Sequence, residues 1–562
     1  MLSASVRLFV SLLLAGPAWA APHSATGDRY AVATVQPIAT DAAMAVFREG
    51  GNAVDAAVCA ALTLGVVDNH NSGLGGGCLI LVRSPEGELT AIDGRETAPA
   101  AASRDMFLVD GEPDAERSQV GPLAVATPGA LAAYARLLDD AGTMPLARLL
   151  APGERAARDG FPIDANYAKR LEGNAKALAR FPGSRDALLD ADCRAHPEGF
   201  VLRQPDLAET YARIAAEGPD WFYRGPLAER IDAWMAEHGG VLTKGDFTAY
   251  RAKRREPIVS RYRGRTVVGF PPPSSGGVHV AQILAMLEPF DLAAMMRDEP
   301  DRAVHVVAEA MKRAFADRAH WLGDADFVDV PRGLLDAGYL DRLSATIDPD
   351  RATAVASHGT PPAWRRDLFG RHTTHIAAAD AAGWWVAITA TVNTGFGSKV
   401  IVPGTGLLLN NEMDDFSAQP GAPNAFGLVG ADNNAVAPGK RPLSSMSPTI
   451  VLDEAGAPLL TVGAAGGPKI ITQVVLAILG VVDGGLSLDE AIARPRWHHQ
   501  WRPDTLMVEE AVPAGITRAV EARGHSTRQL ATGGVSQGVI RAADGRLTAV
   551  RDPRIAGKAC AD

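Results

Sequence analysis

The chain has 562 residues, of which 47% are hydrophobic and 21% are charged, and its mean hydropathy is near zero. This balance is typical of a globular protein with a large buried core and excludes a disordered chain. The formal net charge of -10 and the pI near 5.8 argue against nucleic acid or an anionic membrane as a partner, because both require a concentrated basic face.

The N-terminus has the features of a secretory signal. Arg7 precedes the apolar run from Leu8 to Ala15, and the small-x-small site Ala18-Trp19-Ala20 follows. We expect cleavage after Ala20 and a periplasmic or secreted protein. No later segment approaches about 20 uninterrupted apolar residues, so no stable membrane anchor is expected.

The first two thirds of the chain are rich in helical patterns. Thr40-Asp41 opens a helix that ends at Gly50-Gly51, and a second helix from Val54 to Val66 is apolar nearly all round, which predicts burial. A strand from Cys78 to Val82 follows a glycine-rich turn. Further helices are expected at Ala130 to Leu138, Leu207 to Ala216, Leu227 to His238 and Val304 to Phe315.

Strand patterns dominate after residue 373. Thr374 to Ala379 and Trp384 to Val392 are apolar runs joined by a turn, and Val539 to Ala542 and Leu547 to Val550 flank the hairpin signal Asp544-Gly545. Strands that are apolar on both faces need cover on both sides, so stacked sheets between helical layers are expected. No linker-like segment divides the sequence, which predicts one large intertwined unit.

Several polar patterns have ordinary structural interpretations. The basic run Arg251, Lys253, Arg254 and Arg255 is expected to be a solvated helix end or turn. Cys59 and Cys78 lie in apolar runs and are expected in the core, whereas the sequence leaves open whether Cys193 and Cys560 pair.

Three further patterns partly match metal or phosphate sites. Asp324, Asp326 and Asp329 have calcium-like spacing but lack the glycine and the terminal glutamate of a calcium loop. His498 and His499 lie between tryptophans, where a packed aromatic cluster is favoured over a metal site. The glycine run 73–77 lacks the Lys-Ser/Thr of a phosphate loop and is expected to allow close backbone packing. We therefore expect no metal and no cofactor.

Eight strings along the chain form an ordered set. They are Gly73-Leu74-Gly75-Gly76-Gly77, Asp93-Gly94-Arg95-Glu96-Thr97-Ala98-Pro99, Pro271-Pro272-Pro273-Ser274-Ser275-Gly276-Gly277, Arg371-His372-Thr373-Thr374-His375, Thr391-Val392-Asn393-Thr394-Gly395-Phe396-Gly397, Leu409-Asn410-Asn411-Glu412-Met413-Asp414-Asp415-Phe416-Ser417, Arg441-Pro442-Leu443-Ser444-Ser445-Met446-Ser447-Pro448 and Gly463-Ala464-Ala465-Gly466-Gly467. This set resembles the γ-glutamyltransferase family over nearly the whole mature chain, and the sixth and seventh strings are highly specific.

The resemblance implies an α+β fold, the four-layer αββα sandwich of the N-terminal-nucleophile hydrolases. It also implies one precursor with a signal peptide (1–20), a large subunit (21–372) and a small subunit (373–562) that stay associated. The implied activity is that of a γ-glutamyltransferase and glutathione hydrolase. Its partners would be glutathione and other γ-glutamyl compounds as donors, and water, amino acids or dipeptides as acceptors.

The resemblance places an autocatalytic cut between His372 and Thr373, so that Thr373 becomes the N-terminal nucleophile. A threonine hydroxyl needs a base, and a free α-amine with an unperturbed pKa of roughly 7.7 to 8 can serve near neutrality. By the same resemblance Thr391 orients the nucleophile. The backbone N–H groups of Gly466 and Gly467 would form the oxyanion hole, where glycine allows a carbonyl to approach closely.

A γ-glutamyl group presents an α-carboxylate and an α-ammonium, and the resemblance supplies groups for both. Arg95, Ser444 and Ser445 would hold the carboxylate, while Asn393, Glu412 and Asp415 would hold the ammonium. Residues 420–440 resemble the loop that covers the glutamyl site in many members, with Phe426 where bacterial relatives often have tyrosine. Because phenylalanine lacks the phenol's hydrogen bond, closure of this loop is expected to be weaker.

Two alternatives remain open at this point. The first is a sister acylase on the same scaffold that hydrolyses glutaryl or cephalosporin-type amides. The second is an unprocessed chain that only binds γ-glutamyl peptides. The complete set of carboxylate and ammonium ligands favours the transferase over the acylase, and the presence of Thr373 and Thr391 argues against the binding protein.

Overall fold

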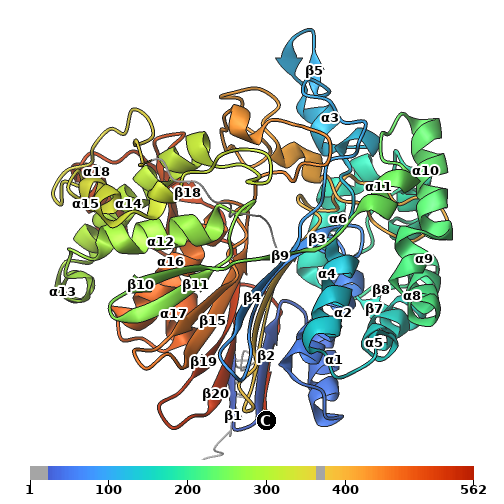
Figure 1. Ribbon diagram of the computed structural model, residues 1–562, viewed down its shortest axis with the longest axis horizontal. Coiled ribbons are helices and arrows are strands. Elements are labelled where there is room, and N and C mark those ends of the chain that lie inside the picture. The colour runs from blue at the N-terminus through green and yellow to red at the C-terminus, as the bar shows by residue number, and fades with distance from the viewer. Residues whose placement is uncertain (1–22, 363–373) are drawn as a thin grey trace, which may run out of the picture.

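The computed structural model describes residues 23–362 and 374–562, which form two seven-stranded antiparallel sheets stacked face to face (Figure 1). The strand order of the first sheet is β1 (Ser24–Gly27), β20 (Leu547–Arg551), β19 (Val535–Arg541), β15 (Pro458–Ala465), β14 (Thr449–Leu452), β11 (Arg265–Gly269) and β10 (Ile258–Tyr262). The order of the second is β21 (Lys558–Ala561), β2 (Tyr30–Thr34), β12 (His375–Asp380), β13 (Trp385–Thr391), β3 (Gly77–Arg83), β4 (Leu89–Gly94) and β9 (Lys253–Arg255).

Helices cover the outer face of each sheet. The first sheet packs against α12 (Gly276–Leu287), α16 (Lys469–Val482) and α17 (Leu488–Ala493), and the second against α1 (Pro37–Arg48), α2 (Ala53–Val67) and α4 (Ala130–Ala141). Further helices outside these are α5 (Leu146–Asp159), α6 (Ala165–Leu178), α8 (Pro205–Glu217), α10 (Pro226–His238), α13 (Leu292–Asp298), α14 (Pro300–Trp321), α15 (Ala337–Ser344) and α18 (Ala514–Ala522). The layers follow the order αββα, which confirms the predicted fold class.

Shorter elements complete the chain. The short helices are α3 (Ala115–Gln119), α7 (Pro182–Leu188), α9 (Pro219–Tyr223) and α11 (Lys244–Ala249). The short strands are β5 (Leu108–Val109), β6 (Glu112–Pro113), β7 (Phe161–Pro162), β8 (Val201–Leu202), β16 (Trp497–His498), β17 (Leu506–Glu509) and β18 (Thr527–Leu530).

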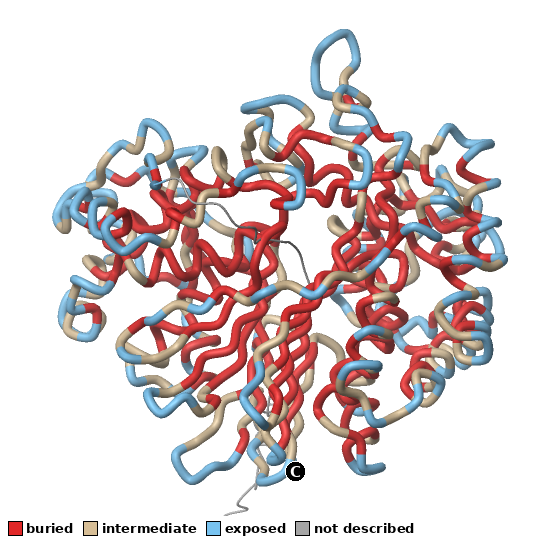
Figure 2. The backbone as a smooth tube through the Cα atoms, viewed as in Figure 1, coloured by how far each residue is buried: buried red, intermediate tan, exposed pale blue. Residues whose placement is uncertain are grey.

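Alanines are frequent in the layer between the two sheets, beside larger residues such as Trp385 and Phe270. Ala31, Ala377 and Ala387 of the second sheet are fully buried there, together with Val539 and Ala549 of the first. Alanine at these positions lets the sheets approach closely without voids. Figure 2 shows the central strands of both sheets as buried backbone, whereas the edge strands, the outer helices and the loops carry the intermediate and exposed residues.

The apolar pattern predicted the central elements well. Helix α2 spans Ala53–Val67, every residue of it is buried, and a capping box of Asn52 and Asp55 fixes its start. The strands β12, β13, β19 and β20 confirm the four predicted runs within a few residues. The predicted start of the first helix at Thr40 is wrong, because Pro37 occupies the first turn and the Gln36 side chain accepts from the Ile38 N–H.

The prediction for the basic run is right for Arg251, which is exposed just after helix α11, and wrong for the strand that follows. Lys253–Arg255 forms the edge strand β9, and Arg255 is nearly buried rather than solvated. Its guanidinium donates to Asp93 at 2.9 Å and to Asp326 at 2.7 Å. Those carboxylates come from distant parts of the chain, so the run itself gives no sign of them.

The glycine run allows the expected close packing. A Cβ added at Gly75 would lie 2.0 Å from the Leu408 carbonyl oxygen, and one at Gly76 would lie 1.8 Å from the Thr391 carbonyl oxygen. Cys59 and Cys78 are buried and free, as predicted for core residues, and Cys193 and Cys560 are also free.

None of the helices in the described part of the chain is both long and apolar enough to cross a bilayer alone, although the bent pair α12 and α13 meets the length and composition test together.

Gly76→Ala should destabilise the protein by about 1 to 3 kcal/mol or more, because its methyl group overlaps a backbone carbonyl that cannot rotate away. Gly173→Ala is the matched control, since its Cβ meets nothing within 4 Å and lies inside helix α6. That variant should be more stable by about 0.5 to 1 kcal/mol. Thermal unfolding of both variants measures the difference, and equal melting temperatures would contradict the packing argument.

Candidate active site

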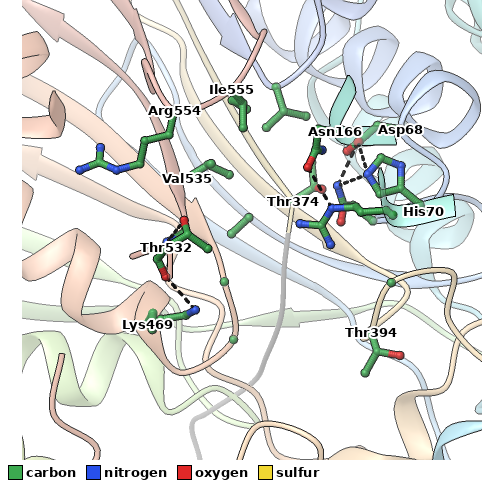
Figure 3. Close-up of a pocket in the computed structure, with 18 of the residues that line it drawn as sticks. Asp68, His70, Asn166, Thr374, Thr394, Lys469, Thr532, Val535, Arg554 and Ile555 are labelled. Atoms are coloured by element: carbon green, nitrogen blue, oxygen red, sulfur yellow. Dashed lines mark hydrogen bonds and ion pairs between the residues drawn. The ribbon is translucent and has the colours of Figure 1, made fainter. Parts of the chain in front are cut away.

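A cavity of about 760 Å³ opens beside the ends of β13 and β15. Its wall includes Thr374, the end of helix α2 with Asp68, the loop after β13 with Asn393, and the turn that contains Gly466 and Gly467. Figure 3 shows Asp68, His70, Asn166 and Thr374 grouped at one side and Lys469 with Thr532 at the other. His372 and Thr373 lie outside the described residues, and Thr374 directly follows them in the chain.

Backbone pairing fixes the position of Thr374. Strands β12 and β13 pair antiparallel, with His375 opposite Thr389, and the Ala390 N–H donates to the Thr374 carbonyl at 2.5 Å. Thr391 is the last residue of β13 and is buried. The two central strands therefore end at the cavity.

The chain turns sharply after Thr391. The Thr391 Oγ1 accepts from the Asn393 N–H at 2.7 Å, and Asn393 has a positive φ of 76°. The Asn393 Nδ2 donates to the Asn411 carbonyl at 2.9 Å, whereas its buried Oδ1 has no hydrogen-bond partner among the described residues. A left-handed backbone and an open acceptor at one residue are typical of a functional position.

Gly466 and Gly467 join β15 to helix α16 with positive φ values of 138° and 62°. A Cβ at Gly467 would lie 2.8 Å from the Phe426 ring, so the turn also requires glycine for space. Helix α16 starts two residues later and has 14 residues, and its N-terminus faces this turn. Backbone N–H groups and the positive end of the helix dipole favour negative charge here.

Residues 420–440, called the Phe426 loop below, lie against the turn of Gly466 and Gly467. The Gln500 Nε2 donates to the Gly427 carbonyl at 3.2 Å, and the Asn424 Nδ2 donates to Asp415 at 3.2 Å. Residues Phe426 and Gly427 line the cavity. The loop therefore connects the glycine turn with the acidic residue Asp415.

Arg95 is the centre of a buried charge cluster. Its guanidinium donates to Glu412, to Asp415 at 2.7 Å and to the Pro442 carbonyl at 3.2 Å, and Glu96 lies 3.4 Å away. All four charged side chains are fully buried. Such a cluster is stable only because opposite charges are in contact, since an isolated buried charge is very costly.

Burial shapes the acidity of this cluster. It raises the pKa of Glu96 to about 7 and the pKa of Glu412 well above its ordinary value, while the Arg95 charge opposes both shifts. One carboxylate oxygen of each glutamate has no hydrogen-bond partner among the described residues. The cluster thus has open acceptors for a cationic group.

The serine pair lies next to a second buried arginine. Ser445 Oγ accepts from Arg318 Nη2 at 3.4 Å, and the Arg318 Nε donates to Ser275 Oγ at 3.1 Å. The Ser444 carbonyl accepts from the Ser275 N–H at 3.0 Å. Burial lowers the pKa of Arg318 to about 9, and the charge of Asp415 opposes this. Arg318 escaped the sequence analysis because it lies inside a long helix, outside the motif strings.

The predicted residues fall into two groups. Asn393, Gly466 and Gly467 line the cavity. Arg95, Glu412 and Asp415 instead lie in the buried charge cluster, and the structure places Arg95 in contact with the acids that were assigned to the opposite end of the substrate. Ser444 and Ser445 are buried beside Ser275 and Arg318. Asn393 links the groups through its bond to Asn411, the neighbour of Glu412.

The possible metal patterns have other partners. Asp324 accepts from the Arg441 N–H at 2.8 Å, and Asp326 pairs with Arg255. His498 packs edge-on against Phe315, as expected for an aromatic cluster, and His499 lies 3.1 Å from Asp504. Within residues 23–362 and 374–562, no group of three or more His, Cys, Asp or Glu side chains could hold a metal ion.

Asp68 is the second residue that the sequence analysis missed. It ends the apolar helix α2 and is 5% exposed. Burial raises the pKa of its carboxyl to about 7, although the side chains of Asn71 and Thr374 favour the charged form. A charged residue directly after a helix that is apolar at nearly every position was the available signal.

Asp68→Asn should make the folded protein more stable at pH 8 by about 1 to 3 kcal/mol, and no more stable at pH 3. Folding raises this pKa from 3.8 to about 7, so ionisation of the folded protein costs stability as the pH rises through that window. Melting temperatures at both pH values test this. Asp164→Asn is the control, because asparagine keeps the N-cap of helix α6, and a gain there equal to that of Asp68→Asn would contradict the prediction.

Known proteins are similar to this chain in sequence and in fold. A family model described as gamma-glutamyltranspeptidase matches residues 39–561. A protein named glutathione hydrolase proenzyme from Escherichia coli strain K12 is 42% identical over 95% of this chain and 91% of its own length.

Two solved structures are also similar. The cephalosporin acylase from Bacillus halodurans has a TM-score of 0.86 at 28% identity, covering 100% of this chain and 99% of that one. The γ-glutamyltranspeptidase from Helicobacter pylori has a TM-score of 0.55 at 36% identity, covering 57% of this chain and 91% of that one. From its sequence match and its fold, the chain belongs to the γ-glutamyltranspeptidase family.

Proposed function

We propose that the chain is a γ-glutamyltransferase and glutathione hydrolase that is exported and cuts itself between His372 and Thr373. Residues 1–20 are the signal peptide, residues 21–372 become the large subunit and residues 373–562 the small subunit. Glutathione and other γ-glutamyl compounds are the donors, and water, amino acids or dipeptides are the acceptors. Export places the enzyme in the periplasm or the medium.

One observation supports the assignment of the nucleophile more than any other. Thr374 lines the cavity and pairs through its carbonyl with Ala390. Continuation of that register by one residue in the processed enzyme would set Thr373 opposite Thr391, at the cavity edge. A cut at this bond would create a free amine where the cavity wall begins.

The chemistry follows from this placement. The α-amine of Thr373 takes the proton of its own hydroxyl, and the oxygen attacks the γ-carbonyl of the donor. Gly466 and Gly467 stabilise the developing oxyanion with backbone N–H groups at the start of helix α16. Thr391 orients the nucleophile from the neighbouring strand. The acyl-enzyme then passes its γ-glutamyl group to water or to an amine.

The buried cluster would recognise the glutamyl end. Arg95 with Ser444 and Ser445 binds the α-carboxylate, and Glu412 and Asp415 bind the α-ammonium. The open oxygens of Asn393 and Glu412 supply acceptors for that ammonium. Donor binding would then replace part of the contact between Arg95 and the two acids with contacts to the substrate's own charges.

An acylase is the second candidate, because the Bacillus halodurans cephalosporin acylase shares the fold over nearly its full length. A glutaryl group has the same length as a γ-glutamyl group but lacks the α-ammonium, so it would leave three acceptor residues without a ligand. The Phe426 loop, which contacts the glycine turn, also favours the γ-glutamyl donor.

Thr373→Ala should give an uncut, inactive precursor, because alanine has no hydroxyl for either reaction. A denaturing gel and a mass spectrum of the mature N-terminus test this. Thr532→Ala is the matched control, since Thr532 also lines the cavity and its Oγ1 accepts only from the Gly534 N–H among the described residues. The control should process normally, and two chains of normal size and activity in Thr373→Ala would refute the assignment.

The enzyme should cleave γ-glutamyl-p-nitroanilide at least about 100-fold more efficiently than glutaryl-7-aminocephalosporanic acid, measured as kcat/KM. The reason is that polar groups built for a substrate ammonium remain unpaired when the substrate lacks it. Equal efficiencies, or a preference for the glutaryl compound, would favour the acylase.

A further inference from the structure

One side of the cavity contains a carboxylate, Asp68, that has no role in the mechanism described above. Asp68 Oδ1 accepts from Asn71 Nδ2 at 3.0 Å and lies 3.4 Å from His70 Nε2. Its second oxygen, Oδ2, is buried and has no hydrogen-bond partner among the described residues. Asp68 lines the cavity together with Thr374, and Figure 3 shows the two side by side.

Asp68 is unfavourable for stability where it stands. It is the C-cap of helix α2, whose negative dipole end repels a carboxylate. The helix itself is fully buried, so water screens this repulsion poorly. The side chains of Asn71 and Thr374 favour the charged form of Asp68, but among the described residues Oδ2 has no hydrogen-bond partner and no compensating cation is in contact. The position therefore suits a carboxylate that meets a cation from outside the protein.

The remaining charges around Asp68 do not neutralise it by contact. Burial lowers the pKa of His70 well below its ordinary value, so this imidazole is neutral. Arg170 is exposed on helix α6, and its charge lowers the pKa of Asp68 without a direct contact. The charge of Asp164 raises the same pKa and so opposes this effect. Tyr167 is buried and its phenol donates to Asn69 at 2.8 Å, away from Asp68.

We propose that Asp68 binds the ammonium of the amine acceptor and takes its proton. This inference rests on the proposed γ-glutamyl transfer and names the acceptor class, a primary amine that is protonated in solution. Apart from Asn393, the proposed glutamyl ligands lie outside the cavity wall, so the part of the cavity beside Asp68 is left for the acceptor.

The proton and electron balance of the step is simple. The Asp68 carboxylate takes one proton from the acceptor ammonium, and the free amine then attacks the ester carbonyl of the acyl-enzyme. The new C–N bond forms, the C–O bond to Thr373 breaks, and the second amine proton moves to the Thr373 oxygen. Asp68 finally releases its proton to solvent. No oxidant, reductant or metal is needed.

The test measures the ratio of transfer to hydrolysis in the processed enzyme, with γ-glutamyl-p-nitroanilide as donor and methionine as acceptor. In Asp68→Asn this ratio should fall by about 100-fold, the usual contribution of a general base. Asparagine has nearly the same shape and can still accept from Asn71. With hydroxylamine as acceptor, which is uncharged at neutral pH, the ratio should fall less than threefold.

Two further variants complete the experiment. Asp68→Glu keeps a carboxylate and should restore at least a tenth of the transfer to methionine. Asp164→Asn removes the same charge from the same cavity and should change the ratio less than twofold.

The outcomes separate the two proposals. A parent enzyme that neither processes nor hydrolyses the donor would overturn the proposed function itself. If the parent is active, three results for Asp68→Asn would overturn the role of Asp68. The variant could lose hydrolysis and transfer equally, or it could keep the parental ratio of transfer to hydrolysis. It could also lose transfer to methionine and transfer to hydroxylamine to the same extent. If Asp68→Asn is not processed, Asp68→Glu is the deciding variant. A processed Asp68→Glu enzyme that transfers nothing to methionine would also overturn the role of Asp68.

Discussion

The pairing of β12 with β13 is the constraint on which the site depends. Its backbone ladder runs from Ala379 opposite Trp385 to His375 opposite Thr389, and the bond between Ala390 and Thr374 extends it to the cavity. Small side chains on these strands let the other sheet approach, and that sheet brings the glycine turn after β15. Close packing of Gly76 against the Thr391 carbonyl holds the end of β13 from the other side. Backbone geometry, more than side-chain contacts, therefore positions Thr374, Thr391 and the glycine turn at the candidate site.

Sequence reasoning predicted best where local pattern decides the structure. Helix α2 and the central strands were visible because nearly every position in them is apolar. The edge strand β9 was missed because its partners, Asp93 and Asp326, are far away in the sequence. The family motifs identified Arg95, Glu412 and Asp415, but the direct contacts between them join residues 317 and 320 positions apart and follow from no local pattern. Arg318 and Asp68 lie outside those motifs, and only burial without full pairing distinguishes them.

The buried charged groups of this fold lower the stability of the folded protein, although the same groups are suited to binding charged ligands. Asp68, Glu96 and Arg318 each have a pKa displaced toward the neutral form, which means that folding disfavours their charged states. A large core on both outer faces of the sheets compensates for this cost. Functional sites commonly retain such groups, because the binding of an oppositely charged ligand relieves the same penalty.

The sheet order has a consequence for the two chains that a cut after residue 372 would create. Five strand pairs would join them: β1 with β20, β14 with β11, β21 with β2, β2 with β12, and β13 with β3. Strand β2 of one chain lies between two strands of the other, and the C-terminal residue Asp562 accepts from the Arg29 and Tyr30 N–H groups. The mature chains would thus be interleaved through their main-chain hydrogen bonds, so neither dilution nor exchange could part them without unfolding the whole molecule.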